Sequence, residues 1–204
     1  MDKKLGISCE LVSSDKMNHA WNIIEIGGKW YHVDVTWDDP TWDCIGRTVH
    51  TYFLLSDDQI KVAGTGDKHE AWVTTRTADS DLYDDAFWAD ISSAFCYYQG
   101  EWYYAQKNSS SMTLNKRSEL LTGEEETVYT STDIWGGWQG CFTYLSQANG
   151  QIYLNTGTAI HRLNADGTVA KVYEPQIPEN QKIFGFTVRG KNLCYALQDT
   201  PNLT

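Results

Sequence analysis

Apolar and polar residues alternate in two short runs on either side of the pair Gly27-Gly28, within the stretch HAWNIIEIGGKWYHVDV that begins at His19. Such alternation predicts half-buried β-strands, and a glycine pair between them favours a two-residue hairpin turn. A turn of this length fixes the register, so that residues whose numbers sum to 55 face each other. Ile26 is therefore expected opposite Lys29.

This register places His19, Trp21, Asp34 and Thr36 on one face of the hairpin, because side chains alternate between the two faces of a strand. His19 and Asp34 become diagonal neighbours, ~7–8 Å apart at the backbone, within reach of an imidazole–carboxylate hydrogen bond. A histidine oriented by an aspartate is the general-base half of a nucleophilic triad. Taken alone, such a pair is more often a structural hydrogen bond, so both interpretations stay open.

Other elements follow from local patterns. Residues 5–13 are typical of a helix end followed by a strand, with Gly6 as the break. Residues 52–55 form an apolar strand, and Ser56 is placed to cap a short helix through Val62. Residues 63–90 are polar and rich in aspartate, which predicts a long wrapping loop.

From Ile91 the pattern changes to short aromatic strands separated by turns. Gly100, Gly150 and Gly190 each precede such a strand, and Arg117 and Arg162 lie 45 residues apart in a second recurring element. Repeats of this length suggest β-propeller blades, although a plain meander of hairpins is the alternative. About two blades and the start of a third are expected, whereas closed propellers have ~4–8.

Composition narrows the choice of partners. The 204 residues carry a formal net charge of −11, which argues against a nucleic-acid backbone or an anionic membrane as partner. The sequence has no apolar run long enough for a transmembrane segment, and its start does not resemble a signal peptide. The five cysteines are scattered without a C-x-x-C pair, which argues against a zinc ribbon.

Three motifs carry a family resemblance: Gly-Ile-x-Cys at 6–9, His-Ala-Trp-Asn at 19–22, and Trp-Tyr-His-Val-Asp-Val-Thr-Trp-Asp-Asp-Pro at 30–40. Together they resemble the bacterial transglutaminase-like superfamily, papain-like enzymes with a Cys-His-Asp triad. The similarity continues more weakly through YFLLSDDQI, His69 and YDDAFW. Propeller-like repeats often follow domains of this family.

The resemblance implies roles for named residues. His19 corresponds to the general base and Asp34 to its orienting acid, while Trp21, Asn22 and Trp37 line or brace the cleft. The implied chemistry is acyl transfer from an amide bond, as in a peptidase, deamidase or transamidase. It requires no metal and no cofactor. The implied substrate is a protein or peptide, with cell-wall peptide as one possibility, at an extracellular or cell-surface location.

The nucleophile departs from the family pattern. Family members carry it on a helix some tens of residues before the histidine, but only 18 residues precede His19. Cys9 falls on a predicted strand, which offers neither the helix N-terminus nor the adjacent base that activates a thiol. Cys44, in the loop after Pro40, is free to approach the site, but nothing in the pattern places it there. We therefore expect an N-terminally truncated enzyme that is inactive alone.

Two metal sites are conceivable alternatives. His32 shares the face of His19 and Asp34, so these three side chains form a conceivable zinc cluster. The acidic run Asp79–Asp90 is a conceivable calcium site, although its spacing does not fit an EF-hand and a solvated surface is the simpler interpretation.

The sequence thus predicts an α+β fold. Residues 1–90 are expected to form a partial papain-like, transglutaminase-like domain with an antiparallel sheet core. Residues 91–204 are expected to form an all-β, incomplete β-propeller-like module. The alternative function is a non-catalytic pseudoenzyme or a surface module that binds peptide or cell-wall glycan.

Overall fold

The structure is a computed structural model that describes residues 6–39, 48–108, 110–134 and 144–199. The chain divides into two compact units, which are treated separately below. Of the described residues, the first unit holds 6–39 and 49–90, and the second holds Thr48 and those from Ile91 onward.

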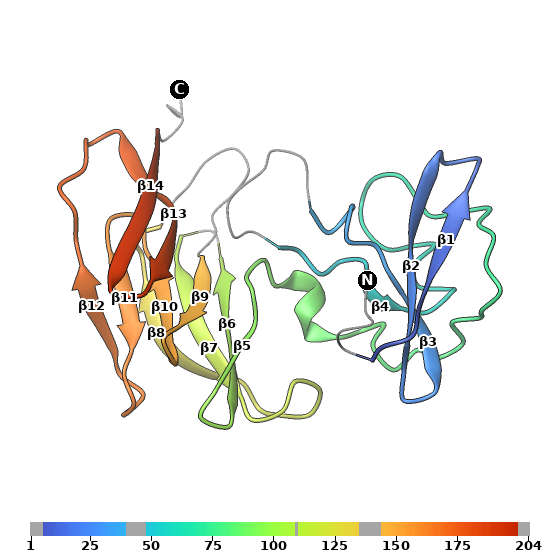
Figure 1. The fold of residues 1–204 in the computed structure, drawn as a ribbon, viewed down its shortest axis with the longest axis horizontal. Helices are drawn as coiled ribbons and strands as arrows, with labels where there is room; N and C mark the ends of the chain where they lie inside the picture. The colour runs from blue at the N-terminus through green and yellow to red at the C-terminus, as the bar shows by residue number, and fades with distance from the viewer. Residues whose placement is uncertain (1–5, 40–47, 109, 135–143, 200–204) are drawn as a thin grey trace. The chain divides into compact units, whose positions relative to one another are not determined.

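The first unit is built on one antiparallel sheet with strand order β1-β2-β3-β4 (Figure 1). The strands are β1 (Cys9–Ser14), β2 (His19–Ile26), β3 (Lys29–Val33) and β4 (Phe53–Leu55). Each strand pairs with its sequence neighbour, so the sheet is a simple meander.

The hairpin between β2 and β3 has the predicted register. Gly27 and Gly28 both have positive φ angles, 60° and 78°, as a type I′ turn requires. Ile26 pairs with Lys29 and Asn22 with Val33, so the paired numbers sum to 55. This part of the prediction is confirmed.

The α+β prediction is wrong. The structure is nearly all β, with 45% of the described residues in strands and no α-helix among them. A single turn of 3-10 helix, η1 (Phe87–Asp90), is the helical element of the described chain. No helix in the described part of the chain has the length and apolar character needed to cross a membrane.

The segment after Ser56 shows why a helix fails there. The Ser56 hydroxyl does accept the Gln59 N–H at 3.0 Å, and the Ser56 carbonyl accepts the Ile60 N–H at 3.0 Å. The turn then tightens and stops at Gly64, whose φ is +70°. So short a segment cannot propagate a helix. The helix end expected at residue 5 lies outside the described residues.

The long loop after Ala63 closes over one face of the sheet. Ser13 and Val73 form an isolated bridge between β1 and this loop. The buried core beneath joins sheet residues to residues from the turn and the loop: Val12, Trp21, Ile23, Tyr52, Leu55, Ile60, Ala63 and Ala78. The loop is therefore a structural part of the unit and brings its side chains onto the sheet.

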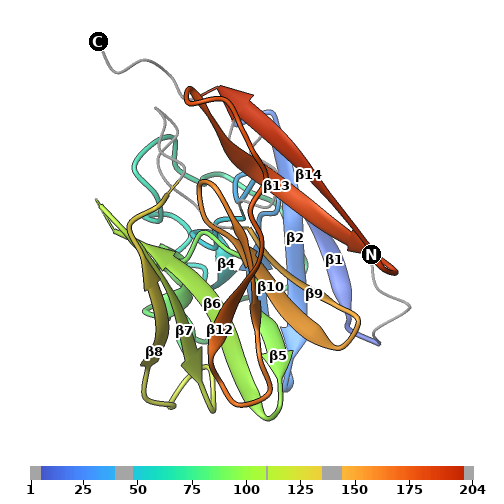
Figure 2. The same ribbon diagram turned by 90° about the vertical axis from the view of Figure 1, so that its left-hand side faces the viewer.

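The described residues of the second unit form three antiparallel sheets in chain order (Figure 2). The first comprises β5 (Cys96–Tyr98), β6 (Glu101–Lys107), β7 (Met112–Arg117) and β8 (Glu126–Ser131). The second comprises β9 (Leu145–Ala148), β10 (Gln151–Asn155), β11 (Ile160–Leu163) and β12 (Val169–Tyr173). The third comprises β13 (Gln181–Arg189) and β14 (Asn192–Asp199).

The sequence repeats correspond to equivalent positions in these sheets. Gly100, Gly150 and Gly190 each lie in the turn that joins the first two strands of a sheet, and each has a positive φ. Arg117 and Arg162 both lie on the third strand of a sheet. A four-stranded antiparallel meander is also the strand content of one propeller blade.

Neighbouring sheets contact each other through β9 and β10, both of which contact β5 of the first sheet and β13 of the third. The first and second sheets share one apolar core, formed by Cys96, Tyr103, Ala105, Met112, Leu114, Leu145, Ile152, Leu154 and Leu163. These two sheets therefore pack against each other across a common core.

The β2–β3 turn provides a test of backbone conformation. An added Cβ meets no atom within 4 Å at either Gly28 or Gly66, but only Gly28 has a positive φ. We expect Gly28→Ala to lower the free energy of unfolding by about 1 kcal/mol, since an L-residue is strained there. Gly66→Ala is the matched control and should leave it unchanged or slightly raised. Urea unfolding followed by tryptophan fluorescence measures both, and equal effects would contradict the type I′ turn.

Candidate functional site

His19 and Asp34 meet at one end of the first sheet. His19 begins β2 and Asp34 directly follows β3. The His19 Nε2 and the Asp34 Oδ2 are 2.6 Å apart. The Asp34 N–H donates to the Tyr52 carbonyl at 3.0 Å, which fixes the backbone of Asp34 beside β4. The diagonal contact expected from the hairpin register is therefore present.

The two carboxylate oxygens of Asp34 have separate roles. Oδ1 accepts the backbone N–H groups of Thr36 at 3.0 Å and Trp37 at 3.1 Å, so the chain after β3 wraps around it. Oδ2 faces two imidazoles, the His19 Nε2 and the His69 Nε2, the latter at 2.8 Å. The Asp34 side chain is fully buried, whereas that of His19 keeps 15% of its surface exposed.

The protonation of this cluster follows from its hydrogen bonds. Burial raises the pKa of Asp34, but hydrogen bonds from His69, His19 and the Trp37 N–H outweigh burial and hold the pKa below its usual value. An ionised carboxylate only accepts hydrogen bonds, so both Nε2 atoms must carry a hydrogen. In neutral His19 the lone pair then lies on Nδ1, and this nitrogen is the basic one.

Two tryptophans restrict the His19 ring. The ring is nearly parallel to Trp21, with centroids 5.7 Å apart, and to Trp37, with centroids 5.1 Å apart. Stacking of this kind limits the ring to few orientations. Asn22, grouped with these residues by its motif, follows Trp21 on β2 and so points to the opposite face of the sheet.

His69 is a site residue that residue patterns did not identify. It comes from the long loop, is 1% exposed, and packs against Trp21 and Trp37 with centroids 4.7 Å and 4.2 Å away. Its Nδ1 is buried and has no hydrogen-bond partner among the described residues. No periodicity marks a lone histidine in a polar loop, and only the weaker part of the family resemblance included it.

His32 does not join the cluster. Its Nδ1 accepts the Trp21 indole N–H at 2.9 Å, and its Nε2 lies 2.8 Å from Asp57 Oδ1. Burial lowers the pKa of His32, although the Asp57 carboxylate opposes this shift. The ring is therefore neutral, with its hydrogen on Nε2. The conceivable cluster of His19, His32 and Asp34 does not form, and His69 occupies the third position.

Cys9 lies away from the pair. Ser14 is opposite His19 in the β1–β2 ladder, and Cys9 is opposite Ile24. Cys9 is five positions from Ser14, an odd offset, so Cys9 points to the other face, roughly 16 Å along the strand. Cys96 and Cys194 belong to the second unit. Cys44 lies outside the described residues.

The acidic run is engaged in local contacts. Asp84 accepts the Ser56 N–H at 2.8 Å and the Ser56 hydroxyl at 2.6 Å. Asp79 pairs with Lys29 at 3.2 Å. With Asp57, Asp58 and Asp81 they line an open hollow of about 630 Å³. The calcium site suggested by the sequence stays a prediction.

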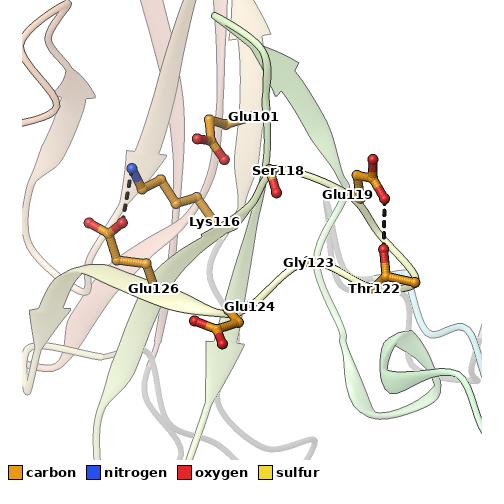
Figure 3. A pocket seen from close by; sticks show the side chains of 8 residues that line it. All are labelled: Glu101, Lys116, Ser118, Glu119, Thr122, Gly123, Glu124 and Glu126. Atoms are coloured by element: carbon orange, nitrogen blue, oxygen red, sulfur yellow. Dashed lines mark hydrogen bonds and ion pairs between the residues drawn. The ribbon is translucent and has the colours of Figure 1, made fainter.

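A separate pocket of about 410 Å³ lies on the first sheet of the second unit (Figure 3). Four glutamates and one lysine line it, together with smaller residues of the β7–β8 loop: Glu101, Lys116, Ser118, Glu119, Thr122, Gly123, Glu124 and Glu126. Lys116 pairs with Glu126 at 3.1 Å. Four negative charges against one positive charge leave the pocket with a net charge of −3.

Comparisons with protein-family models, with curated proteins and with solved structures find no match for this chain.

Asp38 is a second buried carboxyl next to the site. It is 6% exposed, and its Oδ1 accepts the Tyr52 N–H at 2.9 Å. Burial, opposed by this hydrogen bond and reinforced by the charge of Asp34, raises the pKa of Asp38 to about 7.

This pKa predicts a stability change with pH. The ordinary value is 3.8, so between about pH 4 and 7 the folded protein holds a proton that the unfolded chain has released. Stability should fall as the pH rises through this range. Asp38→Asn keeps an acceptor for Tyr52 but stays neutral. The free energy of unfolding of the unsubstituted protein should therefore fall by about 2 kcal/mol more than that of Asp38→Asn when the pH is raised from 5 to 8.

The measurement is urea unfolding at both pH values. Asp39→Asn, at the exposed neighbouring carboxylate, is the matched control and should not alter the pH dependence. An unchanged pH dependence in Asp38→Asn would show that Asp38 is already ionised at pH 5.

Proposed function

We propose that the first unit supplies the base and the orienting acid for thiol-dependent acyl transfer from amide bonds, as in the transglutaminase-like enzymes that its sequence resembles. The observation that carries the proposal is the 2.6 Å contact between His19 Nε2 and a fully buried, ionised Asp34. This contact leaves Nδ1 of a partly exposed imidazole as the basic atom. General-base catalysis requires that arrangement.

The proposed reaction begins with proton transfer from a cysteine Sγ to His19 Nδ1. The thiolate attacks the amide carbonyl carbon, and Asp34 stabilises the imidazolium through Nε2–H. When the C–N bond breaks, the departing amine takes the proton from Nδ1 and a thioester remains. Water or a primary amine then attacks the thioester. His19 removes the attacking group's proton, and the thiol is released.

The nucleophile is proposed to come from outside the described residues. Cys9 faces away from His19, so the proposal gives it no catalytic role. Cys44 and a cysteine on a preceding helix, as in the family pattern, are the two sources. The helix N-terminus of the second source would itself lower the thiol pKa.

The test uses the longest natural form of this chain. Release of ammonia from glutamine-containing peptides, hydrolysis of peptides, and incorporation of a fluorescent primary amine report the three possible outcomes of acyl transfer. We expect iodoacetamide to abolish the activity and His19→Ala to lower kcat at least 100-fold, since the base is lost. Asp34→Asn should lower it strongly as well.

His50→Gln is the control, because it removes a histidine outside the cluster. Activity that persists in His19→Ala would contradict the proposal. Cys44→Ser tests the first source of the thiol: loss of activity assigns Cys44, and retained activity excludes it.

A non-catalytic binding module is the second candidate. It is favoured by the pocket in Figure 3, where carboxylates and hydroxyls gather on the first sheet of the second unit. Its net charge of −3, from four glutamates and one lysine, suits a cationic peptide.

For this candidate we expect a lysine-rich fluorescent peptide to bind the chain, more weakly as salt is raised. The double variant Glu101→Gln/Glu124→Gln should weaken binding about 5-fold, because exposed ion pairs each contribute less than ~1 kcal/mol. Glu179→Gln, at an exposed site away from the pocket, is the charge-matched control for one substitution. Equal effects of all substitutions would place the binding elsewhere.

A further inference from the structure

We propose that His19, Asp34 and His69 bind a zinc ion. One ligand atom from each of the three side chains lies within 4.8 Å of the other two. They converge from three places in the chain, the start of β2, the residue after β3 and the long loop. The binding itself does not depend on the proposed acyl transfer.

The donor set suits zinc. Imidazole nitrogen and carboxylate oxygen bind Zn²⁺ at about 2.0–2.2 Å, and a tetrahedral site then separates neighbouring donors by about 3.3 Å. The present separations from Oδ2 are 2.6 Å to His19 and 2.8 Å to His69. An opening of roughly half an ångström at each contact is a small side-chain rotation.

The hydrogen bonds around Asp34 also favour zinc binding. The Thr36 and Trp37 N–H groups hold Oδ1, so the carboxylate is oriented while Oδ2 remains directed at the imidazoles. Outer contacts of this kind orient metal ligands and increase affinity. Aromatic rings surround the His69 ligand, because Trp21 and Trp37 both pack against its ring.

Hydrogen positions also permit metal binding. Zinc takes the Nε2 lone pairs, so each neutral ring must carry its hydrogen on Nδ1 instead. For His19, whose side chain is 15% exposed, water can accept this hydrogen. The His69 Nδ1 has no partner within the described residues in the present state, so moving the hydrogen there replaces one unsatisfied group with another. Water reaching the exposed side of His19 can fill the fourth coordination position.

Metal and base function exclude each other at this site. With zinc on Nε2, the Nδ1 of His19 carries a hydrogen and has no lone pair with which to accept a proton. Zinc is therefore expected to act as an inhibitor if the acyl-transfer proposal holds.

Calorimetric titration of the metal-free chain with ZnCl2, after its cysteines are alkylated with iodoacetamide, tests binding without reference to activity. We expect one ion per chain. His19→Gln and His69→Gln should each weaken binding at least about 100-fold, because even outer contacts are worth 10–100-fold. His50→Gln is the matched control and should bind with unchanged affinity. No binding, or full affinity in both site variants, would overturn the proposal.

A second measurement uses the unsubstituted chain, so its result does not depend on whether the variants fold. Histidine ring NMR signals should shift with one equivalent of zinc for His19 and His69. The signals of the remaining histidines, His32, His50 and His161, should stay in place. Shifts confined to those three would place the zinc elsewhere and would reject the site. A loss of zinc binding leaves the acyl-transfer proposal standing, because the latter rests on cysteine- and His19-dependent activity.

Discussion

A buried carboxylate that must be fully hydrogen-bonded controls the arrangement of the first unit. An ionised Asp34 without partners would cost several kcal/mol, because its charge is removed from water. Four N–H donors compensate: two backbone groups on Oδ1 and two imidazoles on Oδ2. These donors come from β2, from the chain after β3, and from the long loop. Satisfying one side chain therefore joins the sheet to a loop that has little regular structure of its own.

The part of this site that the sequence predicts is the part that depends on local rules. A two-residue turn at Gly27-Gly28 sets the register, and the register brings His19 to Asp34. His69 reaches the same oxygen from 35 residues away through a loop with no period, so alternation cannot locate it. His32 shows the opposite failure. It lies on the expected face, but its ring is held by Trp21 on the hairpin itself and by Asp57 beyond the hairpin, and not by Asp34.

The fold class could not be obtained the same way. Ser56 makes the predicted capping hydrogen bond, yet the turn stops at Gly64, whose φ of +70° is not helical. The helical half of the α+β prediction came from family resemblance and from this cap. The strand repeats are more predictable, because the first two strands of each sheet described in the second unit are joined by a turn whose glycine needs a positive φ. A backbone requirement at single residues is visible in sequence, whereas the outcome of packing is not.

The two proposals place opposite demands on one nitrogen. A base at His19 Nδ1 needs a hydrogen on Nε2, directed at Asp34, whereas zinc needs the lone pair of that Nε2. Because a neutral imidazole only moves its hydrogen from one nitrogen to the other, the exchange requires no net protonation. Free metal concentration, more than pH, then decides which state is occupied. The exchange is possible because both histidines contact the same oxygen, Oδ2 of Asp34. His69 thereby provides a third zinc ligand, whereas a histidine–aspartate pair alone would have offered only two.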